Sequence, residues 1–222
     1  MNLKPMGKEL GVKVKRVYGI LVGALWLLLV PVIGMAAAEG KTLVVLGDSL
    51  SAGYGLKQGT GWVALFERRL AERGIALQVV NESISGEVTA GGLARLPGII
   101  ERVEPDMLVI ELGGNDGLRG LSPKVMEKNL GKMVAMAEAK GIEVFLFGMK
   151  LPPNYGAAYN RLFEGAFTKV AEEYGVPLLP FFLDGVGGYL EMMQADGIHP
   201  NQGAQGRLME NAWGFLEGYL RD

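Results

Sequence analysis

Short apolar segments recur along the chain from residue 42 onward and are separated by longer segments with a different pattern. Each apolar segment is six to eight residues long, a length typical of buried strands. The pattern predicts five β-strands, over residues 42–47, 75–81, 106–113, 142–148 and 176–182.

The segments between the predicted strands repeat apolar side chains every three or four residues, which is typical of one face of an α-helix. Gly74 is a stop signal for the first of them, and Ser122 and Pro123 supply an N-cap and a first helical residue for the third. Pro97 lies inside the second, and we expect it to break or delay part of that helix. The predicted helices cover residues 62–74, 88–103, 122–141, 157–174 and 203–219.

Strands that alternate with helices predict an α/β fold with a mainly parallel sheet that helices cover on both faces. In such sheets the loops beyond the carboxyl ends of the strands carry function. Residues 39–222 contain no internal repeat, low-complexity tract or linker. We therefore expect one domain over 39–222 and look for its chemistry at one edge of the sheet.

The first 38 residues follow another pattern. Five basic residues and one acid precede the uncharged apolar run "GILVGALWLLLVPVIGM", and three alanines end at Ala38. A basic start, an apolar middle and a small-residue end are typical of a secretory signal peptide, so we predict that residues 1–38 are removed and that the protein is periplasmic or secreted. The alternative is an uncleaved membrane anchor, because the run approaches the roughly 20 residues that span a bilayer.

The charge balance changes when the leader is set aside. Five of the 22 basic and one of the 24 acidic residues lie in 1–38, which leaves 17 and 23 and a net charge of −6 for 39–222. That balance argues against a nucleic acid as partner. The chain has no cysteine, which excludes a thiol nucleophile, a thiolate metal site and lipid attachment to cysteine.

Ser49 follows the first predicted strand in "LVVLGDSLSAGYG" (43–55). A serine at a strand end faces the functional edge, but its hydroxyl is a weak nucleophile without a base. Taken alone, Gly-Asp-Ser is more often a turn or a helix cap.

His199 is the single histidine of the chain and lies in "DGIHPN" (196–201), before the last predicted helix. Asp196 precedes it by three residues, a spacing that lets the carboxylate reach Nδ1 and leaves Nε2 free for a hydroxyl. The alternative is an ordinary turn of Asp, Gly and Pro. Together, Ser49, His199 and Asp196 predict a nucleophile, a base and an orienting acid.

Two polar loops after the second and third strands supply candidate donors for an oxyanion. "NESISGE" (81–87) contains Gly86, whose backbone N–H a carbonyl oxygen can approach closely, and "GGNDG" (113–117) contains Asn115 with its side-chain amide. The backbone N–H of Ser49 is the third candidate. Asp48, beside the nucleophile, is a rival for the acid of the triad, and Asp116 is a weaker rival of the same kind; we expect both to be structural acids.

The stretches "GDSLSAGYG", "NESISGE", "GGND" and "DGIHP" resemble the four sequence blocks of the GDSL, or SGNH, hydrolases. Ser49, Gly86, Asn115 and His199 match the four letters of the second name, and the likeness extends over nearly all of 39–222. The resemblance implies a flavodoxin-like three-layer α/β/α fold with Ser49, Asp196 and His199 as the triad. It further implies an exported enzyme of broad specificity for aryl esters, acyl thioesters and lysophospholipids.

The loop "MKLPPNYGAAY" (149–159) is a candidate acyl-binding segment. It carries Leu151 and Tyr155 and is stiffened at Pro152, so these three are the predicted substrate-binding residues; the loop is equally well explained as a packed connector. We expect no metal and no organic cofactor, a small-molecule or lipid acyl ester or thioester as substrate, and a monomer.

Three functions are compatible with the sequence. The preferred one is an exported serine acyl hydrolase. The second is an esterase that removes acetyl groups from cell-wall or extracellular sugars. The third is an envelope protein that binds an acyl ligand without catalysis.

Overall fold

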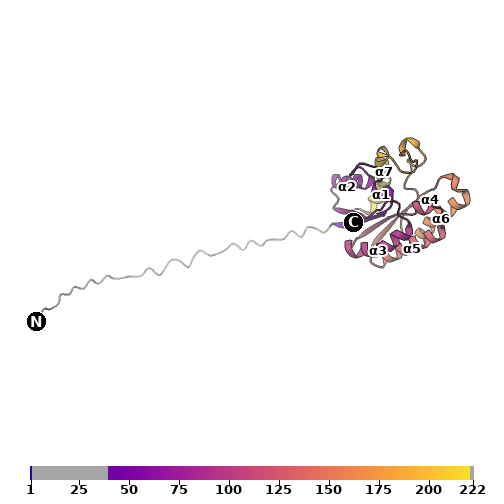
Figure 1. Ribbon diagram of the computed structural model, residues 1–222. Helices are drawn as coiled ribbons and strands as arrows, with labels where there is room; N and C mark the ends of the chain where they lie inside the picture. The colour runs from indigo at the N-terminus through magenta and orange to yellow at the C-terminus, as the bar shows by residue number, and fades with distance from the viewer. Residues whose placement is uncertain (2–39, 221–222) are drawn as a thin grey trace. The chain divides into compact units, whose positions relative to one another are not determined.

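All five predicted strands are present and pair in one parallel sheet. The computed structural model describes Met1 and residues 40–220 (Figure 1). The strand order is β2-β1-β3-β4-β5, which is the flavodoxin-like order with its crossover reversal beside β1. The strands are β1 (Lys41–Gly47), β2 (Leu77–Asn81), β3 (Met107–Glu111), β4 (Glu143–Phe147) and β5 (Leu178–Leu179).

The two central strands carry continuous apolar runs because helices cover both of their faces. The side chains of 43–46 in β1 are at most 1% exposed, and every residue of β3 is buried. In the edge strand β2 the three apolar residues are half-buried, and Gln78 and Asn81 are exposed. Burial of this kind stabilises a fold by about 25 cal/mol per Å² of apolar surface, so β1 and β3 form the centre of the core.

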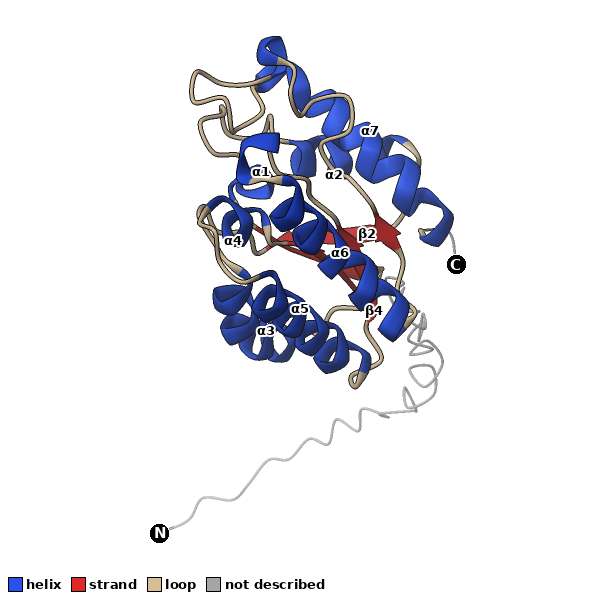
Figure 2. Ribbon diagram, turned by 90° about the vertical axis from the view of Figure 1, so that its right-hand side faces the viewer, coloured by secondary structure: helices blue, strands red, loops and turns tan. Residues whose placement is uncertain are grey.

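The helices form a layer on each side of the sheet, with α2 and α7 on one face and α3 and α5 on the other (Figure 2). Helix α6 packs against α5 and belongs to the same layer. The predicted three-layer α/β/α architecture is therefore confirmed. The longer helices are α2 (Trp62–Glu72), α3 (Thr89–Val103), α5 (Pro123–Glu138), α6 (Ala157–Tyr174) and α7 (Gln205–Leu216). The short elements are α1 (Ser49–Ala52), α4 (Gly114–Leu118) and the 3-10 turns η1 (Pro153–Tyr155), η2 (Leu190–Met192), η3 (Gln202–Ala204) and η4 (Glu217–Tyr219).

The fifth strand is shorter than predicted, with two residues in place of the seven of 176–182. Pro177 and Pro180 flank it and have no N–H to donate to a ladder. Pro177 still accepts a hydrogen bond from the Leu146 N–H through its carbonyl. The prolines thus let the segment pair with β4 on one side but stop it from extending.

The prediction that Pro97 breaks its helix is wrong, since α3 continues from Thr89 to Val103 with Pro97 inside it. The side chain of Pro97 is exposed, so its ring lies on the solvent side of the helix and does not disturb the core. The apolar face of the helix packs on the core, with Leu96, Ile99 and Ile100 buried. The free energy of this burial exceeds the cost of the helical hydrogen bond that Pro97 cannot donate.

The predicted leader lies outside the described residues, apart from Met1. Within residues 40–220, no helix is both long and apolar enough to cross a bilayer.

Candidate active site

Ser49 stands where β1 ends and the single turn of α1 begins. Asp48 caps that turn, because its Oδ1 accepts a hydrogen bond from the Leu50 N–H at 3.0 Å. Gly53 ends it with φ +74°, a left-handed conformation that favours glycine. The result is a tight turn that places Ser49, 8% exposed, in the wall of a groove.

Asp196 and His199 share a loop that is closed at its base by an antiparallel bridge between Met193 and Pro200. Oδ1 of Asp196 accepts hydrogen bonds from the backbone N–H groups of Ile198 at 2.9 Å and His199 at 3.0 Å. One carboxylate oxygen of Asp196 therefore stabilises the conformation of the loop, and the other oxygen is available to the imidazole of His199.

The structure brings the three predicted residues into one hydrogen-bonded chain. His199 Nε2 lies 2.9 Å from Ser49 Oγ, and His199 Nδ1 lies 2.7 Å from Asp196 Oδ2. The backbone N–H of His199, with its ring and the N–H of Ile198, lowers the pKa of Asp196 to about 2. An ionised Asp196 accepts the Nδ1 proton, which leaves Nε2 as the acceptor for the Ser49 hydroxyl.

Tyr54 and Gln194, which the sequence did not indicate, stabilise the hydrogen-bonded series of Ser49, His199 and Asp196. The ring of Tyr54 lies 4.5 Å from that of His199, centre to centre. Gln194 Nε2 donates to the carbonyls of Tyr54 at 2.8 Å and Pro200 at 3.1 Å, and so connects the two loops. Nothing in the local sequence marks Gln194, since its two partners are 140 and 6 residues away.

Asn115 lies beside the nucleophile turn in α4. Its Nδ2 donates one hydrogen to Asp48 Oδ2 at 2.9 Å, and an amide nitrogen carries a second hydrogen for another acceptor. Asn115 and Ser49 line the same groove.

Gly86 belongs to the loop after β2. The loop is attached to the end of β1 through the Ile84 N–H and the Gly47 carbonyl. Arg119 Nη2 donates to the Gly86 carbonyl at 2.8 Å. The φ of Gly86 is +80°, so a side chain at this position would be strained.

Asp48 and Asp116, the acids next to the predicted nucleophile and the predicted amide donor, hydrogen-bond to other groups of the protein. Asp48 accepts from Leu50 and Asn115, as described above. Asp116 accepts from the backbone N–H of Thr89 at 2.8 Å and from its hydroxyl at 2.6 Å. Asp116 thereby supplies, from a distant loop, the cap that the first residues of α3 lack.

A groove of about 450 Å³ opens over Ser49 and His199. Leu151 and Pro152 line it, whereas the Tyr155 hydroxyl donates to the carbonyl of Leu118, another lining residue, at 3.0 Å. Its wall is mainly apolar, with Leu118, Met149, Leu151, Pro152, Phe181 and Ile198 among the lining residues.

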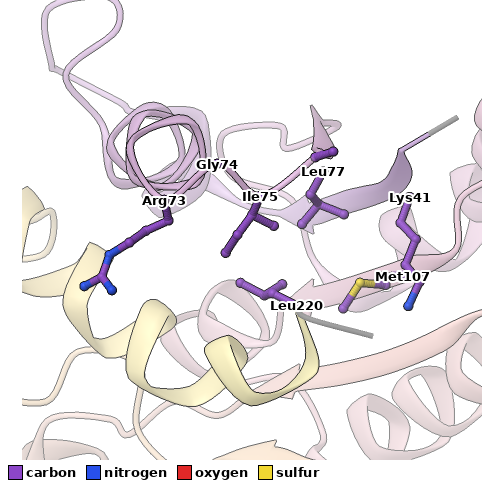
Figure 3. Close-up of a pocket in the computed structure, with 8 residues that line it drawn as sticks. Lys41, Arg73, Gly74, Ile75, Leu77, Met107 and Leu220 are labelled. Atoms are coloured by element: carbon purple, nitrogen blue, oxygen red, sulfur yellow. The ribbon is translucent and has the colours of Figure 1, made fainter. Parts of the chain in front are cut away.

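A second cavity, of about 490 Å³, lies at the amino ends of the strands (Figure 3). Lys41, Leu77 and Met107, the first residues of β1, β2 and β3, line it together with Arg73 and Leu220. Because the nucleophile and the imidazole lie at the carboxyl ends, this cavity is separate from the groove.

The chain is similar to proteins of known families. A model of the GDSL-like lipase/acylhydrolase family matches residues 45–206. Esterase TesA of Pseudomonas aeruginosa is 52% identical over 183 residues, 82% of this chain and 91% of the relative. Thioesterase 1/protease 1/lysophospholipase L1 of Escherichia coli is 44% identical over 169 residues, 76% of this chain and 80% of the relative.

Among solved structures, the psychrotrophic esterase EstA from Pseudoalteromonas sp., inhibited by monoethylphosphonate, superposes with a TM-score of 0.79. It is 37% identical, and the match covers 82% of this chain and all of that one. The family match spans well over half of the chain and includes Ser49, Gly86, Asn115, Asp196 and His199. The chain belongs to the GDSL-like lipase/acylhydrolase family and is a hydrolase of ester bonds.

Proposed function

We propose that this protein is an exported serine acyl hydrolase that cleaves carboxylic esters and acyl thioesters through Ser49, His199 and Asp196. The observation that carries the proposal is the unbroken chain from Ser49 Oγ to His199 Nε2 at 2.9 Å and from Nδ1 to Asp196 Oδ2 at 2.7 Å. This order of groups activates a hydroxyl, because the imidazole accepts its proton while the carboxylate stabilises the imidazolium that forms.

The first half of the reaction acylates the enzyme. His199 Nε2 takes the proton of Ser49 Oγ as the oxygen attacks the acyl carbon. The carbonyl oxygen becomes an oxyanion, which the backbone N–H groups of Ser49 and Gly86 and the free N–H of Asn115 stabilise. Each such donor typically contributes about 3–4 kcal/mol to the transition state. The intermediate then expels the alcohol or thiol, which leaves with the proton from Nε2.

The second half releases the acid. A water molecule gives its proton to His199 Nε2 and attacks the acyl-enzyme carbon. A second tetrahedral intermediate forms at the same donors. Its collapse breaks the bond to Ser49 Oγ, which regains its proton from the imidazole, and the carboxylic acid departs.

The groove supports an acyl chain as the part of the substrate that the enzyme binds. Its apolar lining, from Leu151 and Pro152 to Phe181, offers burial for methylene groups at about 0.8 kcal/mol each. The relatives carry the names esterase, arylesterase and thioesterase 1/protease 1/lysophospholipase L1, which agrees with a site that accepts several leaving groups. The signal-like pattern of 1–38 supports export, and we propose that 39–222 works as a monomer.

Covalent labelling tests the nucleophile. The full chain is treated with an organophosphonate ester and analysed by mass spectrometry. We expect one adduct on Ser49, no adduct in Ser49→Ala, and an unchanged adduct in Ser122→Ala, which alters an exposed serine. An unlabelled wild-type protein would support a non-catalytic acyl-binding protein.

A substrate panel tests the reaction class. We expect the wild-type protein to hydrolyse p-nitrophenyl acetate and an octanoyl thioester, and Ser49→Ala to hydrolyse neither. Hydrolysis of acetylated polysaccharide alone would instead assign the enzyme to the carbohydrate esterases.

A further inference from the structure

A buried acid that the reaction does not use lies directly under the nucleophile turn. Glu111 is the last residue of β3 and is paired in register with Gly47 of β1, two residues before Ser49. Its exposed fraction is 0%. A Cβ on Gly47 would lie 2.7 Å from Glu111 Oε2, so the absence of a side chain there lets the carboxyl approach the turn.

The carboxyl group of Glu111 holds the turn on both sides of Ser49. Its Oε2 accepts the hydroxyl proton of Ser51 at 2.6 Å and the backbone N–H of Asp48 at 3.3 Å. Trp62 Nε1 donates to Ser51 Oγ at 3.1 Å, which extends the network into α2. The orientation of the turn therefore depends on one oxygen of Glu111.

The other oxygen, Oε1, is buried and has no hydrogen-bond partner among the described residues. No ion pair within that part of the chain includes Glu111. Its charged neighbour is a second acid, Asp48, which in turn interacts electrostatically with His199. A carboxylate in such surroundings loses its hydration without a compensating cation, which is costly.

The hydrogen bonds indicate which of the two acids carries a proton. Asp48 has a donor on each oxygen, from Leu50 and from Asn115, and such donors favour an ionised carboxylate. Glu111 accepts the Ser51 hydroxyl and the Asp48 N–H on Oε2, whereas Oε1 accepts no hydrogen bond within the described residues and is open to a proton. Burial raises the pKa of Glu111 well above its usual range, and repulsion from Asp48 raises it further. The hydrogen bonds from Ser51 and Asp48 lower the pKa of Glu111, but less than its burial raises it.

We propose that Glu111 is a neutral positioning residue, protonated on Oε1, that holds the nucleophile turn through Oε2. The proposal rests on the proposed function of Ser49. A neutral acid orients Asp48 and Ser51 as a carboxylate would, but it places no second negative charge beneath the site where the substrate oxygen becomes negative. The stabilisation of that oxyanion by nearby dipoles is then not opposed.

Infrared difference spectroscopy on the full chain tests the protonation state. At pH 8, Asp48, whose pKa burial raises to about 6, is mainly ionised. We expect the wild-type protein to show the carbonyl stretch of a protonated carboxylic acid, and Glu111→Gln to lose it. Glu143→Gln, which alters an exposed glutamate of β4, should keep it. A wild-type spectrum without the band, or a band that survives in Glu111→Gln, would overturn the proposal.

Kinetics test the positioning role. Glu111→Gln keeps a neutral acceptor for Ser51 and Asp48, and we expect its kcat to stay within about tenfold of the wild type. Glu111→Met keeps the approximate volume but has no such acceptor, and we expect kcat to fall about 10²-fold with KM little changed, as for a misplaced reacting group. Equal losses in both variants, or none in Glu111→Met, would contradict the role.

The two proposals fail in different ways. An inactive wild-type protein that phosphonate does not label would remove the proposed function, whereas the infrared band needs no turnover. If Glu111→Met does not fold, as judged by thermal unfolding, the band and the kcat of Glu111→Gln still decide the matter.

Discussion

At the scale of single residues, His199 is the position on which the proposed chemistry depends most. It is the single histidine of the chain, so no second imidazole can replace it. We expect His199→Ala to lower kcat for p-nitrophenyl acetate by about 10⁴-fold or more, as the loss of a triad base does. Thermal unfolding of the variant serves as the control for folding. A kcat within tenfold of the wild type would mean that another group acts as the base.

Asp196 is also expected to affect how the stability of the folded protein depends on pH. Its folded pKa of about 2 lies below the roughly 3.9 of an unfolded aspartate. The folded state therefore gains stability from the ionised form above about pH 4 and loses it as the pH falls toward 2. Because the side chain is 38% exposed, solvent screening reduces the gain.

Urea unfolding of the wild type and Asp196→Asn at pH 6, 4 and 3 measures this contribution. We expect the wild type to be the more stable at pH 6 and the difference to shrink at each step down. A difference that grows as the pH falls would contradict the pKa shift of Asp196.

At the scale of elements, α3 contains a matched pair of glycines. Gly98 is exposed, and a Cβ there would meet no atom within 4 Å. We expect Gly98→Ala to raise the free energy of unfolding by about 0.5–1 kcal/mol, because glycine is less favourable than alanine inside a helix. Ester hydrolysis should be unchanged.

Gly92→Ala in the same helix is the control. A Cβ at Gly92 would overlap with Leu112 Cδ1 in the core, so we expect this variant to lose about 1–3 kcal/mol from overpacking. Urea unfolding measures both variants. Similar shifts in both would show that packing under α3 does not distinguish the two positions.

At the scale of the whole molecule, the contacts group Glu39–Asp222 into one compact unit. We expect residues 39–222, produced without 1–38, to unfold in one cooperative transition and to keep the kcat/KM of the full chain for p-nitrophenyl acetate. Ser49→Ala in the same fragment is the matched inactive control. A fragment that fails to fold would show that residues 1–38 contribute to the stability of the domain.

The sequence by itself determined the α/β class, the five strands and the residues at their carboxyl ends. These properties follow from short-range patterns: continuous apolar runs mark strands buried on both faces, and parallel strands bring their carboxyl ends to one edge. Ser49, Asn115 and His199 could therefore be predicted to share a site, although 150 residues separate Ser49 from His199.

Only the tertiary structure decided which contacts hold that site. Gln194 connects two loops through a single amide, and Glu111 is the one acid of a fully buried strand whose other residues are apolar. Their roles depend on which distant groups surround them, and no local pattern encodes that. The same holds for Pro97, where burial of one helix face outweighed a local preference. The spacing of apolar residues predicts which face of a segment is buried. The hydrogen-bond partners of a side chain, and whether a buried acid is protonated, depend on atoms of several segments and can be read only from their positions in the fold.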